Sequence, residues 1–182
     1  MRNQRGITFI EVLVSLVILS TGIIGAVAMQ ASAKKGSFDA MQRSMASALA
    51  QDIIERMRAN DSDPVNLENY QGVYGEGNIG APDNRCDDPD VPCNAQQMIA
   101  NDLYEWEQKL LGANVKQGSS SRGGLVAARG CIDHNNQSVT VVVSWQGRIK
   151  TQDSADSNDT LAFSCGSASD KRRLVQIDAF IF

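Results

Sequence analysis

The chain has 182 residues, with 17 lysines and arginines against 21 aspartates and glutamates, and a net charge of −4 at pH 7. This acidic balance excludes the strongly basic class of nucleic-acid-binding proteins. The length leaves room for one small domain after an N-terminal segment, and four cysteines are an even number, which is typical of disulfide-forming proteins outside the cytoplasm.

The first element in chain order is a long uncharged segment near the N-terminus. Residues 12–33 are 22 residues without a charge or a proline, and as a helix they would reach about 33 Å at ~1.5 Å per residue. A hydrocarbon core is about 30 Å thick, so the segment is predicted to span a membrane. The leader before it carries Arg2 and Arg5, which places the leader in the cytoplasm and the remaining chain outside.

One carboxylate lies inside the apolar start of this helix. Glu11 follows Ile7-Thr8-Phe9-Ile10 and precedes Val12. An unpaired acid deep in lipid costs on the order of 2.5–3.5 kcal/mol, so Glu11 is expected to have a partner and a function. A plain membrane anchor would leave the acid unexplained. A secretory signal peptide ending at residues 31–33 is a further alternative, but the apolar run is long for one and begins with an acid.

The order of these features resembles the class III signal of type IV pilins and type II secretion pseudopilins. The matching features are Gly6 at the end of a basic leader, Glu11 as the fifth residue after it, and the apolar helix. The resemblance implies that a prepilin peptidase cleaves between Gly6 and Ile7 and methylates the amine of Ile7. It also implies that Glu11 pairs with the N-terminal amine of a neighbouring subunit, since opposite charges attract strongly in a low-dielectric setting.

The helix is predicted to continue beyond the membrane. After the apolar run, apolar residues recur in steps of three and four on one helical face, at Phe38, Met41, Met45, Leu49, Ile53 and Met57. The run from Asn60 to Pro64 ends the helix, because proline lacks an amide hydrogen and restricts the residue before it. The predicted division is a cleaved leader over residues 1–6, the membrane and filament half of the helix over 7–33, and an extracytoplasmic globular pilin domain over 34–182.

Residues 61–93 are rich in glycine, asparagine, aspartate and proline without periodicity, and are predicted to be an irregular connection. Four acids near its end could offer oxygen ligands to calcium, namely Asp83, Asp87, Asp88 and Asp90. Because they lack a fixed ligand spacing, the prediction is a solvated loop, and no metal site or cofactor is predicted.

The four cysteines are predicted to form two disulfides. Cys86 and Cys93 lie close together in the sequence, which favours a small loop between them and leaves Cys131 to join Cys165, although four cysteines allow three connectivities. A zinc site is disfavoured because no C-x-x-C pair is present. The only histidine, His134, is predicted to be a surface turn residue.

A second helix is predicted from Asn94 to Leu111. Asn94 is a favourable N-cap, Gln97 completes a capping box, and Gly112 supplies the C-terminal stop. Ile99, Leu103, Trp106 and Leu110 would line its apolar face.

Strands are predicted over residues 125–132, 139–145, 161–165 and 172–182, with a chain reversal at 133–136. The strand over 139–145 is the strongest, with four apolar side chains alternating on one face: Val139, Val141, Val143 and Trp145. The polar stretch from residue 147 to 159 is predicted to be a loop with solvated acids at Asp153, Asp156 and Asp159. A long helix followed by an antiparallel sheet predicts an α+β fold in which the sheet wraps the second half of the spine helix.

Three segments narrow the resemblance to the PilV family of minor pilins, the type IV pilus modification proteins: residues 11–16, 20–25 and 102–106. The resemblance implies a low-abundance structural subunit that gathers with other minor and major pilins, lipid and the inner-membrane assembly machinery. Such a subunit primes pilus assembly and can stay at the tip. Its location would be the bacterial inner membrane, as a single-pass protein with a periplasmic domain, and then the pilus.

Two other functions remain open. A type II secretion pseudopilin would share Gly6, Glu11 and the spine helix. A tip subunit that binds a surface or DNA would use the one dense basic run, residues 171–173, but this run is predicted to be a solvated strand start and no nucleic acid is expected. The chain lacks a G-x-S-x-G elbow and a metal frame, so it is predicted to be a peptidase substrate and not an enzyme.

Overall fold

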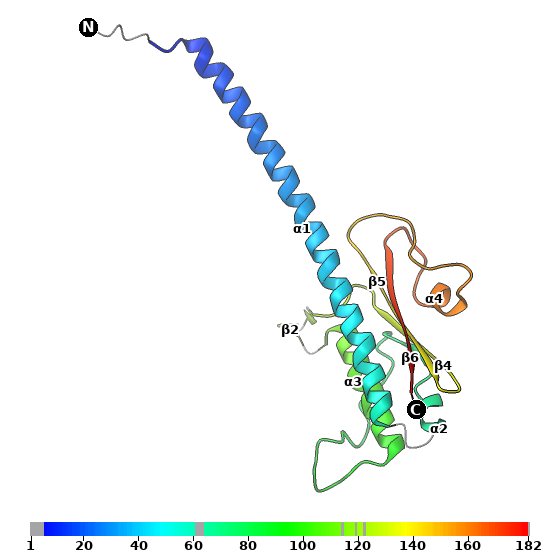
Figure 1. Cartoon of the computed structure of the whole chain (residues 1–182). Helices are drawn as coiled ribbons and strands as arrows, with labels where there is room; N and C mark the ends of the chain where they lie inside the picture. The colour runs from blue at the N-terminus through cyan, green and yellow to red at the C-terminus, as the bar shows by residue number, and fades with distance from the viewer. Residues whose placement is uncertain (1–5, 61–63, 114, 119, 122, 182) are drawn as a thin grey trace. The chain divides into compact units, whose positions relative to one another are not determined.

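Figure 1 shows the computed structural model of the chain, which describes residues 6–60, 64–113, 115–118, 120–121 and 123–181. The chain divides into two units, Met1–Phe38 and Asp39–Phe182. The described part of the first unit is mostly helix, and every strand of the described residues belongs to the second unit. A long helix, a shorter helix and an antiparallel sheet confirm the predicted α+β fold.

The predicted spine helix is α1 (Phe9–Ala59), which continues without a break through Gly22 and Gly25. In the second unit one of its faces is buried, at Gln42, Ala46, Leu49, Ala50, Ile53, Ile54 and Met57. Met41, which the periodicity assigns to the same face, is 53% exposed. The buried face therefore begins with Gln42.

The second predicted helix is α3 (Ala95–Leu111), and both of its caps are present. The Asn94 side chain accepts from the Gln97 amide at 2.9 Å, and the Gln97 side chain accepts from the Asn94 amide at 3.0 Å. Gly112 ends the helix in the left-handed region, where glycine has no Cβ penalty. The buried indole of Trp106 donates to the carbonyl of Leu49 at 2.8 Å, which joins α3 to α1.

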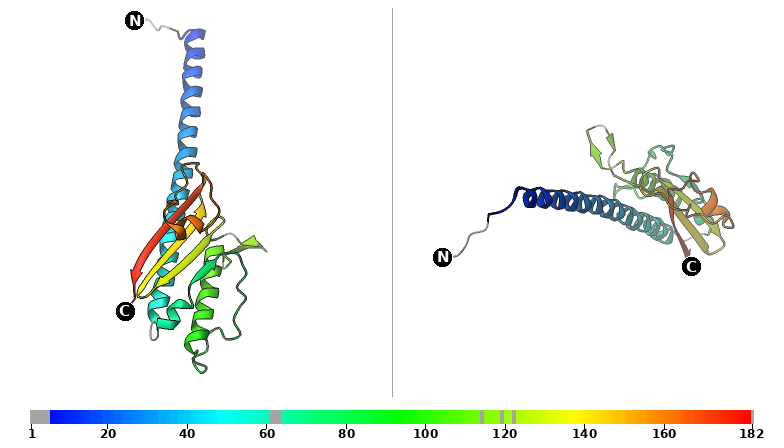
Figure 2. Two further views of the ribbon diagram at one scale, coloured as in Figure 1. Left: turned by 90° about the vertical axis from the view of Figure 1, so that its right-hand side faces the viewer. Right: turned by 90° about the horizontal axis from the view of Figure 1, so that it is seen from above.

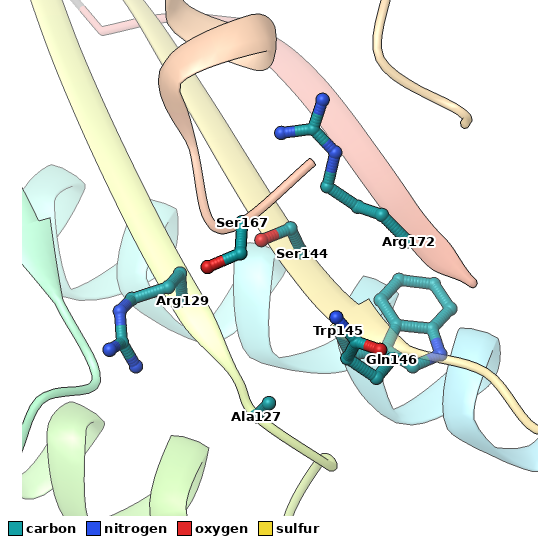
Figure 3. A pocket seen from close by; sticks show the side chains of 7 residues that line it. All are labelled: Ala127, Arg129, Ser144, Trp145, Gln146, Ser167 and Arg172. Atoms are coloured by element: carbon teal, nitrogen blue, oxygen red, sulfur yellow. The ribbon is translucent and has the colours of Figure 1, made fainter. Parts of the chain in front are cut away.

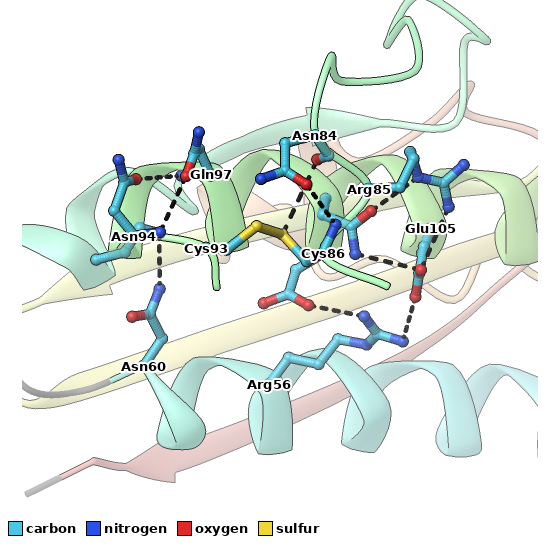
Figure 4. The surroundings of a disulfide bond; sticks show 12 residues. Arg56, Asn60, Asn84, Arg85, Cys86, Cys93, Asn94, Gln97 and Glu105 are labelled. Carbon is cyan, nitrogen blue, oxygen red and sulfur yellow. Dashed lines mark hydrogen bonds and ion pairs between the residues drawn. A yellow bond between two sulfur atoms is a disulfide. The ribbon is translucent and has the colours of Figure 1, made fainter. Parts of the chain in front are cut away.

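A polar cluster also joins α1 to α3, beside a disulfide (Figure 4). Arg56 of α1 donates to Asp102 at 2.7 Å and to Glu105 at 3.0 Å. The Tyr70 hydroxyl donates to the other oxygen of Asp102 at 2.7 Å, and burial raises the pKa of this phenol. Arg85 reaches Glu105 at 3.3 Å. Each buried charge of the cluster has a partner, which offsets the cost of removing it from water.

Four antiparallel strands form the main sheet in the order β1-β4-β5-β6. The strands are β1 (Gly72–Tyr74), β4 (Arg129–Asn135), β5 (Ser138–Gln146) and β6 (Arg172–Phe180). The pair β2 (Lys116–Gln117) and β3 (Ser120–Ser121) forms a separate small sheet. Figure 2 shows β4, β5 and β6 side by side, and Figure 1 shows the sheet between α1 and a short helix, α4 (Thr160–Ser164).

The face of the sheet toward α1 and α3 carries the main core. The predicted alternation along β5 is confirmed, since all four of its predicted apolar residues belong to this core: Val139, Val141, Val143 and Trp145. Ala179 and Ile181 join them from the end of the chain, and Val175 and Ile177 are partly buried against the core. The second half of α1 is therefore covered by the sheet, as the α+β prediction requires.

The prediction of an irregular connection over residues 61–93 was wrong in two places. It contains α2 (Pro64–Glu68) and β1, while residues 61–63 lie outside the described residues. A helix of five residues and a strand of three are too short to show periodicity. The pairing of β1 with β4 is also long-range, so local sequence does not reveal it. Tyr74 at the end of β1 is buried and lies edge-on to Trp106, with ring centroids 5.5 Å apart.

The turn after β1 is held by one buried carboxylate. Glu107 of α3 is 1% exposed and accepts the amides of Gly75 at 3.0 Å, Gly77 at 3.2 Å and Ile79 at 2.9 Å. Both glycines have positive φ, at 101° and 77°, a backbone region that side-chain-bearing residues rarely adopt. Three amide donors offset the cost of burying this charge.

The predicted boundaries of β4 were also wrong, because the strand covers residues 129–135 and not 125–132. Residues 125–128 form a loop, in which the amide of Leu125 bonds to the carbonyl of Leu110 at 3.2 Å. The reversal lies at residues 136–137, where Asn136 has a φ of 56°, a conformation that two-residue hairpins favour. His134 is therefore half-buried within β4 and is not a turn residue.

The predicted strand over residues 161–165 is a helix, α4 (Thr160–Ser164). Asp159, predicted to be solvated, is its N-cap and accepts from the amide of Ala162 at 3.0 Å. Cys165 bonds to Cys131 of β4, so α4 is fixed on the sheet face opposite to α1. Cys131, Val142, Ala162 and Cys165 form a second small core there.

Arg172 and Asp153, both predicted to be solvated, form an ion pair. Arg172 is 2% exposed, and its Nε donates to Asp153 at 2.8 Å. Its Nη1 donates to the carbonyls of Phe163 and Gly166. Figure 3 shows Arg172 beside a small pocket that Ser144 also lines. The pair holds the long connection between β5 and β6 against the sheet.

The structure contains two disulfides, as the cysteine count predicts. Cys86 is joined to Cys93, and Cys131 to Cys165, which is the connectivity that the sequence favours. The first staples the loop before α3 (Figure 4), and the second ties α4 to β4.

Replacing Cys131 and Cys165 by serine should destabilise the chain more than replacing Cys86 and Cys93. The bridges span 34 and 7 residues, for which the chain-entropy model gives about 4 and about 2 kcal/mol. Urea unfolding of the full-length chain and of both double variants in detergent measures the two losses. Equal losses would contradict this ranking.

Acid should weaken the contact between α1 and α3. Partial burial acts to raise the pKa of Glu105, but hydrogen bonds from Arg56 and Asn101 hold it below its usual range. Such a carboxylate adds stability above its unfolded-state pKa, and this stability is lost as pH falls through the lower folded-state pKa. Glu105→Gln should therefore reduce the drop in Tm between about pH 6 and about pH 3.

The matched control for this measurement is Glu55→Gln on α1, where the carboxylate side chain is 67% exposed in its pair with Arg58. This variant should keep the acid dependence of the original chain. A Glu105→Gln variant with an unchanged drop in Tm would show that the cluster does not contribute to acid sensitivity.

Candidate functional site

The predicted cleavage position lies outside the helix. Residues 6–8 precede α1 in non-helical backbone and are exposed, and Ile7 is 80% exposed. Apart from Gly6 and its chain neighbours, no atom of the described residues lies within 4 Å of the position that a Cβ on Gly6 would occupy. The peptide bond between Gly6 and Ile7 is thus accessible in the chain. The leader residues Arg2 and Arg5 lie outside the described residues.

Thr8 and Glu11 form a capping box at the start of α1. Oε2 of Glu11 accepts from the Thr8 amide at 2.9 Å and from the Thr8 hydroxyl at 3.0 Å. The amide of Glu11 in turn donates to Oγ1 of Thr8 at 3.4 Å. The motif Thr-x-x-Glu before an apolar run is the sequence signature of this cap. The prediction from the sequence considered only an external partner for Glu11 and overlooked it.

The cap occupies one oxygen of the carboxylate. Both hydrogen bonds from Thr8 end on Oε2, and within the described residues no hydrogen bond reaches Oε1 of Glu11. An ionised carboxylate offers about four acceptor positions, so Glu11 retains capacity for a further donor. The positive end of the helix dipole at this position also favours a negative charge.

Apolar side chains cover the surface of α1 after this cap. Their exposed fractions lie between 44% for Val12 and 79% for Phe9, and the mean hydropathy of an 18-residue window is 2.5. By length and composition α1 can therefore cross a membrane.

Three hydroxyl groups in this segment are satisfied within the helix. Ser15 donates to the carbonyl of Val12 at 2.8 Å, Ser20 to that of Val17 at 2.9 Å, and Thr21 to that of Val17 at 3.0 Å. Glu11 is the only ionisable side chain between Phe9 and Ala33.

Among the described residues, no group of three histidine, cysteine, aspartate or glutamate side chains is placed to hold a metal ion. In the predicted solvated loop, the Asp88 carboxylate accepts a hydrogen bond from the backbone amide of Asp90 at 2.9 Å. The structure brings together Thr8 and Glu11, whereas the basic run at residues 171–173 is divided, because Arg172 is buried.

Two family models match adjoining segments of the chain. Residues 1–27 match the prokaryotic N-terminal methylation motif, and residues 28–104 match the family of type IV pilin Tt1218. The chain belongs to the type IV pilins. In this pilin the methylation motif includes Gly6, Ile7 and Glu11, and the pilin match extends from α1 into α3. No curated protein and no solved structure matches the chain significantly.

The family and the fold together define the kind of molecule. This pilin is a structural subunit and not an enzyme, and the apolar part of α1 anchors it in a membrane. Pilins assemble with other pilins, and most of the exposed large apolar side chains of the described residues lie on this part of α1.

Proposed function

We propose that this pilin is a minor pilin of the PilV type that primes assembly of a type IV pilus in the bacterial inner membrane, with the tip as its final position. A prepilin peptidase cleaves between Gly6 and Ile7 and methylates Ile7. The globular unit then lies in the periplasm. The observation that carries the proposal is Glu11, the single ionisable group of the apolar helix, which caps its own helix through Oε2 and leaves Oε1 available.

Cleavage supplies the partner that Oε1 lacks. Removing the leader creates an ammonium group on Ile7, four residues before Glu11. The ammonium of a neighbouring subunit can then bind Oε1, because the cap does not need that oxygen. An unpaired carboxylate in lipid costs on the order of 2.5–3.5 kcal/mol, so a subunit gains stability when a neighbour docks beside it.

Helix packing adds a second contribution. Apart from the adjoining backbone of α1 itself, no atom of the described residues lies within 4 Å of the Cβ positions of Gly22 and Gly25, so both positions are open to another helix. Small residues let membrane helices approach closely. Assembly through the apolar half of α1 therefore combines close packing with one charge pair.

Two observations favour a pilus subunit over the alternatives. The match to a type IV pilin family over residues 28–104 supports a pilus over a secretion pseudopilin. DNA binding is disfavoured because residues 39–182 carry 13 lysines and arginines against 20 acids, a net charge of −7. The buried Arg172 also bonds to Asp153, so it is not available to a phosphate.

Gly6→Leu should leave the leader attached, because a side chain would occupy the open position next to the scissile bond. The measurement is the mass of the N-terminal peptide of protein purified from its native membrane. The unmodified chain should begin with N-methylated Ile7 and the variant with Met1. Normal processing of the variant, or an unmodified chain that starts at Lys34, would overturn the processing step.

Glu11→Gln should be processed but should not assemble. Glutamine still suits the third helical position of a capping box, so this variant keeps the cap and loses the charge. Thr8→Ala is the matched opposite, since it removes the capping hydroxyl and keeps the charge, and it should assemble. The amount of the subunit in sheared pili measures both, and wild-type assembly of Glu11→Gln would remove the pairing role.

A further inference from the structure

The loop that follows β5 is basic and exposed. It contains Arg148, Ile149 and Lys150, and all three residues are exposed, although Ile149 is apolar. The backbone amide of Arg148 donates to Oδ1 of Asp39 at 2.9 Å. Asp39 is the first residue of the second unit, so this bond holds the loop at the point where α1 enters that unit (Figure 1).

Further basic side chains lie around this loop. Arg43 is exposed and follows Asp39 by one helical turn. Arg43, Asp39 and Arg173 line one pocket of about 320 Å³. The guanidinium of Arg173 also donates to the carbonyl of Ile149. The start of β6, the loop after β5 and the first turn of α1 in the second unit therefore meet in one place.

The surface that these segments form is positive, although the second unit as a whole is acidic. We call it the basic end, and it carries five bases and two acids: Arg43, Arg148, Lys150, Lys171, Arg173, Asp39 and Asp170. Its net charge is +3, against −7 for residues 39–182. The nearby acid Asp153 is neutralised by its ion pair with the buried Arg172. The basic end is therefore complementary to an anionic partner.

The chain itself brings one anionic surface close to the basic end. The uncharged apolar run of α1 ends at residue 33, and Asp39 follows six residues later. Six residues span about 9 Å as a helix and about 21 Å at most when fully extended. This limit holds for any orientation of the two units. The headgroups of the membrane that holds the apolar run are therefore within reach of the basic end.

We propose that the basic end binds the anionic phospholipid headgroups of the membrane in which α1 is anchored. Arg43, Arg148 and Lys150 donate to lipid phosphate oxygens, and Ile149 lies between the headgroups at the edge of the apolar layer. The tether gives the lipid a high effective concentration at this site, which a soluble partner does not have. The inference rests on the membrane anchoring of α1 and not on the proposed role in pilus assembly.

A label on the loop after β5 tests this proposal in the full chain. Ile149→Cys provides a single reactive thiol for a fluorophore, because the four native cysteines form disulfides. One labelled chain is inserted in each lipid nanodisc, which contains phosphatidylcholine with or without phosphatidylglycerol, and a lipid with a spin-labelled headgroup quenches the fluorophore. Phosphatidylglycerol should increase the quenching roughly threefold, and 1 M salt should abolish the increase because the Debye length falls to about 3 Å.

Equal quenching with and without phosphatidylglycerol would overturn the proposal, since the tether alone would then account for the proximity. The nanodisc contains no other pilin. A negative result would therefore refute the lipid site and leave the proposed assembly function untouched.

The matched control is the same label at position 180, in Phe180→Cys. Phe180 is 63% exposed and pairs with Ser138, whereas Arg172 pairs with Gln146 at the basic end. The two ends of β5 are eight residues apart, which corresponds to about 27 Å. Phosphatidylglycerol should not change the quenching at position 180. An equal increase at both positions would show a general attraction of the unit to the membrane and would refute a defined site.

A pair of charge reversals on α1 gives a second readout from the label at position 149. Arg43→Glu should reduce the increase caused by phosphatidylglycerol by roughly fivefold. Arg58→Glu makes the same change in net charge, but Arg58 lines a different pocket together with Phe180, so it should leave the increase unchanged. Both variants should keep the Tm of the original chain because both side chains are exposed. An unchanged increase in Arg43→Glu would count against the basic end.

Discussion

The packing of the second half of α1 against the sheet is the constraint on which the rest of the structure depends. Ala46 and Ala50 are fully buried on this face, and their small side chains let the sheet and α3 come close to the helix backbone. Trp106 uses that closeness to donate to the carbonyl of Leu49. Further along α1, Arg56 takes part in the charged cluster with α3. The apolar half of the same helix is exposed. Its two halves therefore suit different surroundings, which are lipid for the first half and the core of the globular unit for the second.

The two environments explain why the polar groups of α1 are arranged differently in each half. In the apolar half the hydroxyls of Ser15, Ser20 and Thr21 bond back to carbonyls about one turn earlier, and the one acid caps the helix. In the globular half the charged groups bond across to other elements, as Arg56 does with Asp102. A polar group in lipid has to be satisfied within its own helix or by a neighbouring subunit. The unused oxygen of Glu11 is an acceptor that suits the second possibility.

Local signals predicted the elements that depend on local chemistry. The Asn94–Gln97 cap and the alternation in β5 each depend on residues that are close together in the sequence, and both are present in the structure. Several of the errors concern elements that depend on distant partners. β1 exists because β4 lies beside it, α4 is held by the bond from Cys165 to Cys131, and Arg172 is buried because Asp153 meets it across the connection. At the start of α1 the sequence contains the motif Thr8-x-x-Glu11. The motif predicts a helix cap only if the helix is known to begin at this point.

The hydrogen bonds between Glu107 and the turn after β1 determine which residues of this surface can change. The carboxylate holds backbone amides of residues 75, 77 and 79 and makes no use of the side chains between them. Glu76 and Asn78 are exposed, so their identities can drift without altering the shape of the turn. The pilin thus carries a surface loop of constant outline whose exposed side chains are free to vary.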